Sequence, residues 1–160
     1  MGQCRSIPHQ AERMSFAGTY KARVTHIVDG DTLHIIMKFR GTYDTHTLRL
    51  LGIDTPETHQ CSEREKAIGE KVGAWLTPLV GQKVKVVISK RKGPFDRRLA
   101  RVILPRGEDL TEHMLELGLG KPYDGQRARV PFTPQELTEV DRAVRQAPPL
   151  VIRRWCTLFT

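Results

Sequence analysis

The chain has 160 residues, of which 39% are hydrophobic, and its 26 Lys and Arg outnumber 18 Asp and Glu, for a formal net charge of +8. This length suits one domain with a hydrophobic core, and the composition argues against a chain that is disordered over its whole length. No apolar run approaches membrane-spanning length, so we expect no membrane partner. The basic surplus indicates a polyanionic partner, with nucleic acid as the first candidate and plain solubility as the alternative.

The first residues lack the apolar stretch of a secretory signal. This leaves open both a cytoplasmic protein and a secreted protein whose signal has been removed. The three cysteines, Cys4, Cys61 and Cys156, do not form a C-x-x-C motif, which argues against a zinc knuckle or a redox pair. Sequence alone does not tell whether Cys61 and Cys156 pair.

Residues 1–18 are predicted to form a flexible tail and residues 19–160 a single domain. Three strands follow the tail, predicted from β-branched content and period-two alternation at residues 20–28, 32–39 and 45–53. Asp29-Gly30, between the first two strands, predicts a β-hairpin.

The second half begins with a predicted helix at residues 69–80, although Ser62-x-x-Glu65 offers an earlier start. Two further strands are predicted at residues 83–90 and 98–104. Asp109 then caps a short helix, residues 121–132 are irregular, and Thr133-Pro134 begins a last helix. This order predicts an α+β, mainly β fold, namely a five-stranded antiparallel OB-fold barrel with three flanking helices.

Carboxylates follow two of the predicted turns. Asp31 comes directly after the Asp-Gly turn, whereas Asp54 and Glu57 come directly after the third strand. In a three-stranded meander, the end of the third strand returns beside the start of the second, which brings these carboxylates together. Clustered carboxylates repel one another unless a cation lies among them, and oxygen ligands suit Ca²⁺ or Mg²⁺. Taken singly, each segment is also explained by turn chemistry.

Arginines accompany the carboxylates. Arg49 lies in the third strand, where it either faces the same cleft or is simply solvated on the outside of the barrel. Arg97 and Arg98 follow a Gly-Pro turn. A guanidinium group can bind two phosphate oxygens at once. Together with a hard cation, two such groups would neutralise the negative charge that builds up in the transition state of phosphoryl transfer. Glu57 would position or deprotonate the attacking water.

The series from Val28 to Thr32, followed by the series from Leu48 to Thr58, resembles the staphylococcal nuclease family. The similarity extends over roughly residues 20–155. It implies an OB barrel and Ca²⁺-dependent hydrolysis of DNA and RNA that leaves 3′-phosphates.

The resemblance also implies roles for individual residues. Asp31 and Asp54 would bind Ca²⁺ through their carboxylates and Thr55 through its carbonyl. Glu57 would act on the water, Asp29 would sit in the outer metal shell, and two arginines would hold the scissile phosphate, namely Arg49 and Arg97.

The chain departs from the family pattern before Arg97. A tyrosine and a glycine of the family are replaced by Phe95 and Asp96, so Phe95 can stack on a base but cannot donate a hydrogen bond. Arg98 is an alternative phosphate ligand, and Tyr123 is either a second base platform or an ordinary surface aromatic residue.

The leading hypothesis is a monomeric, Ca²⁺-dependent nuclease acting on DNA or RNA or both. The alternative is a catalytically inactive OB module that binds nucleic acid or a peptide. A third hypothesis is a phosphodiesterase acting on small nucleotides, against which the strong positive charge argues.

Overall fold

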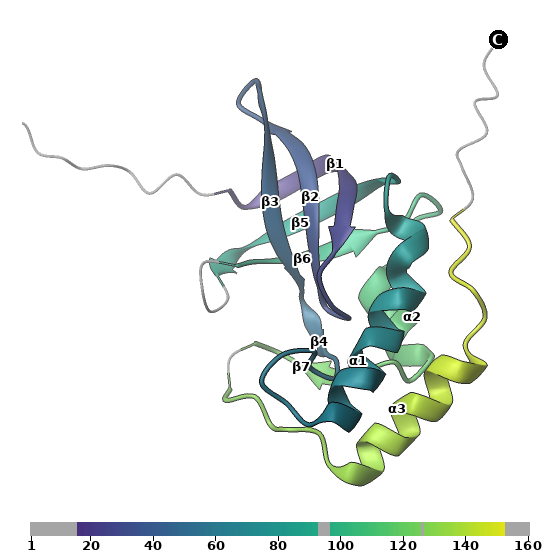
Figure 1. Cartoon of the computed structure of the whole chain (residues 1–160). Helices are drawn as coiled ribbons and strands as arrows, with labels where there is room; N and C mark the ends of the chain where they lie inside the picture. Colours follow the sequence, from purple (N-terminus) through teal and green to yellow (C-terminus); the bar gives the residue numbers. More distant parts are fainter. Residues whose placement is uncertain (1–15, 93–96, 126, 153–160) are drawn as a thin grey trace, which may run out of the picture.

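A computed structural model describes residues 16–92, 97–125 and 127–152. Five strands close into a barrel in the order β1-β2-β3-β6-β5 (Figure 1). Their bounds are Gly18–Ile27 for β1, Thr32–Phe39 for β2, Thr42–Leu50 for β3, Lys83–Lys92 for β5 and Arg98–Ile103 for β6. The predicted α+β, mainly β barrel with three helices is confirmed.

The barrel is mixed rather than antiparallel throughout, which corrects the prediction. Neighbouring strands pair antiparallel except β3 and β6, which run parallel, with Arg49 opposite Leu99. The reason is topological, because strand directions cannot alternate all the way around a closed ring of five. One pair must be parallel, and a long connection such as that between β3 and β6 is what a parallel pair requires.

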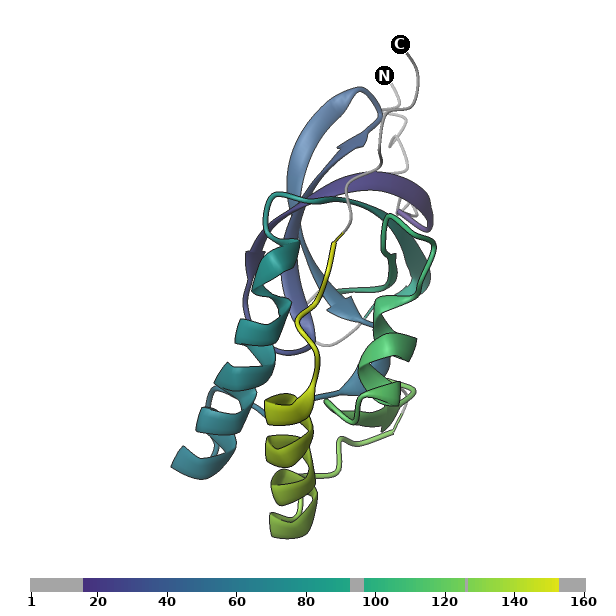
Figure 2. The ribbon, with the colours of Figure 1, turned by 90° about the vertical axis from the view of Figure 1, so that its right-hand side faces the viewer.

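Three α-helices lie outside the barrel: α1 (Glu63–Leu76), α2 (Leu110–Glu116) and α3 (Pro134–Gln146). Helix α1 begins six residues before the predicted start at Gly69, because the Ser62 side chain accepts a hydrogen bond from the Glu65 backbone N–H. It continues into a short 3₁₀ helix, η1 (Thr77–Leu79). Asp109 caps α2 and a complete capping box begins α3, both as predicted. Helices α1 and α3 lie side by side (Figure 2).

Below the barrel, a small antiparallel ribbon joins β4 (Gly52–Asp54) to β7 (Lys121–Tyr123). The predicted third strand at residues 45–53 is therefore interrupted at Leu51. Part of the segment predicted to be irregular, residues 121–132, is instead the second strand of this ribbon. The ribbon pairs Lys121 with Asp54 just after the end of β3, which is where the predicted carboxylates lie.

The core fills the barrel and continues beneath the helices. Its largest fully buried side chains include Leu33, Ile35, Leu48, Ile53 and Leu76. In the described part of the chain, no helix has the length and apolarity needed to span a lipid bilayer.

Candidate cation and phosphate site

The β1–β2 turn places Asp31 against the end of β3. The backbone N–H of Val28 donates to the carbonyl of Thr32 at 2.9 Å, which closes the turn, and that of Leu50 donates to the carbonyl of Asp31 at 2.7 Å. Thr32 lies opposite Arg49 in the β2–β3 register. This register brings Asp31 and Arg49 close together at the start of β2 and the end of β3. The Asp29 carboxylate accepts from the Asp31 backbone N–H at 3.0 Å, so it stabilises the turn itself.

Two glycines let the segment from Asp54 to Glu57 pack against its neighbours. A Cβ on Gly30 would lie 2.6 Å from Oγ1 of Thr55, and one on Gly69 would lie 2.5 Å from the Pro56 carbonyl oxygen. Gly30 therefore brings the β1–β2 turn against this segment, while Gly69 brings helix α1 beneath it. The predicted loop is therefore held by close packing on both sides, through the Thr55 side chain at Gly30 and through its backbone at Gly69.

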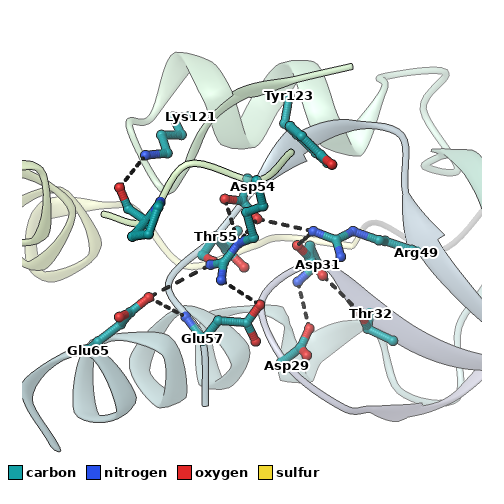
Figure 3. A network of polar contacts seen from close by, with 12 residues as sticks. Asp29, Asp31, Thr32, Arg49, Asp54, Thr55, Glu57, Glu65, Lys121 and Tyr123 are labelled. Atoms are coloured by element: carbon teal, nitrogen blue, oxygen red, sulfur yellow. Dashed lines mark hydrogen bonds and ion pairs between the residues drawn. The ribbon is translucent and has the colours of Figure 1, made fainter. Parts of the chain in front are cut away.

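Arg49 joins two buried carboxylates. Its Nη2 lies 3.0 Å from Oδ2 of Asp31 and 3.1 Å from Oδ1 of Asp54. The three residues are 7%, 5% and 1% exposed, respectively. Figure 3 shows Arg49 reaching between these two carboxylates. The alternative that Arg49 is solvated on the outside of the barrel is wrong.

The environment of Asp31 favours its neutral form. Burial raises the pKa of Asp31 to about 7, and the charges of Asp29 and Asp54 add to this effect. The Arg49 guanidinium and a hydrogen bond from Thr32 act in the opposite direction. A cation bound at this carboxylate would displace the proton, so cation binding and deprotonation of Asp31 are linked.

A second arginine, Arg129, reaches the same cluster from the segment that follows β7. Its Nε lies 2.8 Å from each carboxylate oxygen of Asp54, and its Nη2 donates to the Thr55 carbonyl oxygen at 3.1 Å. Its Nη1 lies 2.8 Å from Oε1 of Glu57. Burial opposes the charge of Arg129, but the hydrogen bond and charge of Asp54, aided by Glu57 and Glu65, raise its pKa.

Glu57 is held by a neighbour on helix α1. Its backbone N–H donates to Oε1 of Glu65 at 3.1 Å, and that same oxygen lies 3.7 Å from Nη2 of Arg129. The Glu65 side chain therefore orients the Glu57 loop instead of completing a capping box at Ser62. With a side chain 33% exposed, Glu57 remains accessible to water.

The donor set suits a hard cation. Oxygens of Asp54, Thr55 and Glu57 already surround one positive group, and Asp31 joins them through Arg49. Carboxylate and carbonyl oxygens are the ligands that Ca²⁺ accepts. Among the residues that the structure describes, no three acidic, His or Cys side chains converge closely enough to share a metal ion. The guanidinium groups of Arg49 and Arg129 lie between the carboxylates.

Of the residues predicted to bind the substrate, some lie beside the carboxylate cluster and others do not. The Tyr123 ring lies beside the site, its centroid 5.7 Å from Cζ of Arg49, and its hydroxyl donates to the Arg127 carbonyl oxygen at 2.8 Å. Arg97 is half-buried directly before β6, whose first residues pair with the end of β3. The Arg98 guanidinium instead stacks on Phe16 at 3.6 Å, which argues against its role as an alternative phosphate ligand. Phe95 and its neighbour Asp96 lie outside the described residues.

Sequence reasoning missed Arg129 and the positioning contact of Glu65. Arg129 lies in an irregular segment 75 residues after Asp54, and nothing in its local pattern distinguishes it from the neighbouring Arg127. The only available signal was its place shortly before a well-capped helix. The sequence pattern indicates Glu65 as a capping residue of the helix but does not indicate its contact with the backbone of Glu57.

Known proteins resemble this chain over most of its length. The sequence profile described as "Staphylococcal nuclease homologue" matches residues 47–147, which is more than half of the chain. This range includes Arg49, Asp54 and Glu57 but not Asp31. The chain is also 28% identical over 125 residues to "Endonuclease YhcR" of Bacillus subtilis (strain 168). That alignment covers 73% of this chain and 10% of the relative, so the chain spans about a tenth of the relative's length.

Proposed function

This chain belongs to the staphylococcal nuclease homologue family, and from that premise we propose that it is a Ca²⁺-dependent nuclease of DNA, RNA or both. The family supports a nuclease-type function in general, as does the endonuclease relative. The observation that carries the finer proposal is the buried cluster in which oxygens of Asp31, Asp54, Thr55 and Glu57 surround two guanidinium groups. Such a cluster is built for positive charge beside a phosphate.

In the proposed reaction, Glu57 accepts a proton from a water molecule whose oxygen bonds to phosphorus. The bond from phosphorus to the 5′ oxygen breaks, the leaving oxygen takes up a proton, and a 3′-phosphate remains. Asp31, Asp54 and the Thr55 carbonyl would hold Ca²⁺, which when bound would stabilise the negative charge of the phosphate oxygens. Glu65 keeps the Glu57 loop in place through the Glu57 backbone N–H.

Arg49 and Arg97 would hold the scissile phosphate. Both carboxylate contacts of Arg49 use Nη2, and a guanidinium has further N–H donors that suit phosphate oxygens. Tyr123 places an aromatic face next to Arg49, where a base can stack. The net charge of +8 would draw a polyanion toward the site.

The test is cleavage of single-stranded DNA and of RNA by the purified protein, with Ca²⁺ and with a chelator. Glu57→Gln should lower kcat by about 10² to 10⁴, the usual contribution of a general base. Arg49→Lys should also reduce cleavage, because an ammonium cannot bridge as a guanidinium does. Glu63→Gln, which changes an exposed glutamate near the start of α1, is the matched control and should leave cleavage unchanged.

Nucleic acid binding without cleavage under any divalent cation would contradict the proposal. It would favour the catalytically inactive OB module. Cleavage of a dinucleotide but not of polymers would instead indicate the small-nucleotide phosphodiesterase.

A further inference from the structure

Arg129 occupies oxygens of Asp54 and Thr55 that the proposed function assigns to a divalent cation, and it also pairs with Glu57, the proposed general base. Both carboxylate oxygens of Asp54, the Thr55 carbonyl oxygen and one oxygen of Glu57 lie within 3.1 Å of its guanidinium nitrogens. Four oxygens from three residues therefore converge on one positive group. Arg49 holds the remaining carboxylate, that of Asp31.

A guanidinium and a divalent cation cannot both use these oxygens. Arg49 already contacts Oδ1 of Asp54, so a divalent ion added beside Arg129 would be the third positive group in a region where the Asp54 side chain is 1% exposed. If Arg129 left and no ion replaced it, however, Arg49 alone would have to balance the carboxylates of Asp31 and Asp54, which is costly. Besides Arg49, the site therefore takes one further cation, either Arg129 or a divalent ion.

The segment that carries Arg129 is attached on both sides of it. Before it, the Tyr123 hydroxyl holds the Arg127 carbonyl at 2.8 Å. After it, Nζ of Lys121 donates to the Pro131 carbonyl at 3.2 Å, and the Phe132 side chain is buried. Between these attachments the chain is open to solvent, because Val130 is 67% exposed.

The Arg129 side chain itself is 27% exposed, whereas the Asp54 carboxylate beneath it is almost fully covered. It can therefore leave the cluster toward solvent without disturbing the barrel. Its departure would also free the Glu57 carboxylate from an ion pair at 2.8 Å.

We propose that Arg129 is an internal cation that competes with the divalent cation for Asp54 and Thr55, so that cation binding expels its side chain and frees Glu57 from its ion pair. The proposal rests on the proposed function, which assigns these oxygens to Ca²⁺. It makes Arg129 the residue that sets the Ca²⁺ concentration at which the site is filled. It also keeps the buried carboxylates neutralised when Ca²⁺ is scarce.

The first test is calorimetric titration of Ca²⁺ into the wild-type protein, Arg129→Ala and Arg127→Ala. Arg127→Ala is the matched control, because Arg127 is exposed, lies two residues from Arg129, and its replacement removes the same charge. We expect Arg129→Ala to bind Ca²⁺ at least about tenfold more tightly than the wild-type protein, since a competing group has been removed. Arg127→Ala should bind Ca²⁺ as the wild-type protein does.

A second test uses the wild-type protein and does not depend on a variant that folds. The Nε–H of Arg129 lies between two carboxylate oxygens, so its NMR signal should be visible without Ca²⁺ and should shift as Ca²⁺ is added. The Nε–H of Arg101 donates to Asp109 at 2.6 Å, away from the cluster, and its signal should stay in place. An Arg129 signal that does not respond to Ca²⁺ would overturn the proposal.

The outcomes separate the two proposals. Equal Ca²⁺ affinities in all three proteins would refute the competition and leave the cation site intact. If Ca²⁺ binds to none of them, including Arg129→Ala, both the cation site and the competition are refuted.

Discussion

The contact between helix α1 and the Glu57 loop provides a demanding test of the site geometry, through Gly69→Ala. The new Cβ would lie 2.5 Å from the Pro56 carbonyl oxygen and 2.8 Å from that of Glu57. Both are backbone atoms, so no side chain can rotate away. The loop must recede by about 0.5 Å before the shorter contact reaches 3.0 Å, a distance below which such contacts essentially do not occur. Overpacking of this kind costs about 1–3 kcal/mol.

The same displacement moves Glu57 relative to the carboxylates. Since a misplacement of about 1 Å in a reacting group can cost about a hundredfold in rate, we expect kcat for nucleic acid cleavage to fall about tenfold. The free energy of unfolding is measured by urea denaturation and kcat with single-stranded DNA. Both measurements are made without changing any residue that would touch the substrate.

Gly73→Ala is the matched control, one turn further along the same helix. There the nearest atom to a new Cβ, the backbone carbon of Asp29, is 3.7 Å away, which is an ordinary contact. This variant should gain about 0.5–1 kcal/mol in stability, because alanine favours a helix over glycine. Equal effects of the two substitutions, or a fully stable and active Gly69→Ala, would refute the reasoning.

Three further predictions concern proton linkage, capping and salt. Because Asp31 keeps its proton below about pH 7 in the cation-free protein and Ca²⁺ needs its carboxylate, Ca²⁺ affinity should fall below that pH. Calorimetry in buffers of different protonation enthalpy should detect proton release at pH 6 and almost none at pH 8, and equal release at both would contradict the assignment. Thr133→Ala removes the capping box of α3 and should lower the free energy of unfolding by about 1 kcal/mol without changing kcat, as denaturation and steady-state kinetics would show. The KM for single-stranded DNA should rise roughly fourfold per doubling of salt if about three phosphates are contacted, and a KM that ignores salt would argue against electrostatic capture.

Local chemistry made much of this fold predictable. The Asp-Gly turn, the alternating strands and the caps at Asp109 and Thr133 are signals carried by a few adjacent residues, and they correspond to elements of the structure. The meander argument predicted that Asp31 and Asp54 lie close together, and in the structure both contact the same nitrogen of Arg49.

The features that the sequence did not reveal depend on contacts between residues that are far apart in the chain. The parallel pairing of β3 with β6 follows from the ring of five strands, and no residue within either strand encodes it. Arg129 reaches Asp54 only because β7 pairs with β4 and carries the following segment over the cluster. Arg98, the alternative phosphate ligand, stacks on Phe16, which lies within the predicted tail and whose contact no local pattern indicates.

The mixed barrel has a consequence for how the protein folds. The β1–β2 and β2–β3 hairpins bring Asp31 and Arg49 together early, because they join residues that are near in sequence. The β3–β6 pairing closes a loop of about fifty residues, from Leu48 to Arg98. The Arg129–Asp54 pair spans 75 residues, whereas the Asp31–Arg49 pair spans 18, so the two guanidinium groups of the site differ in the length of chain that each contact must close.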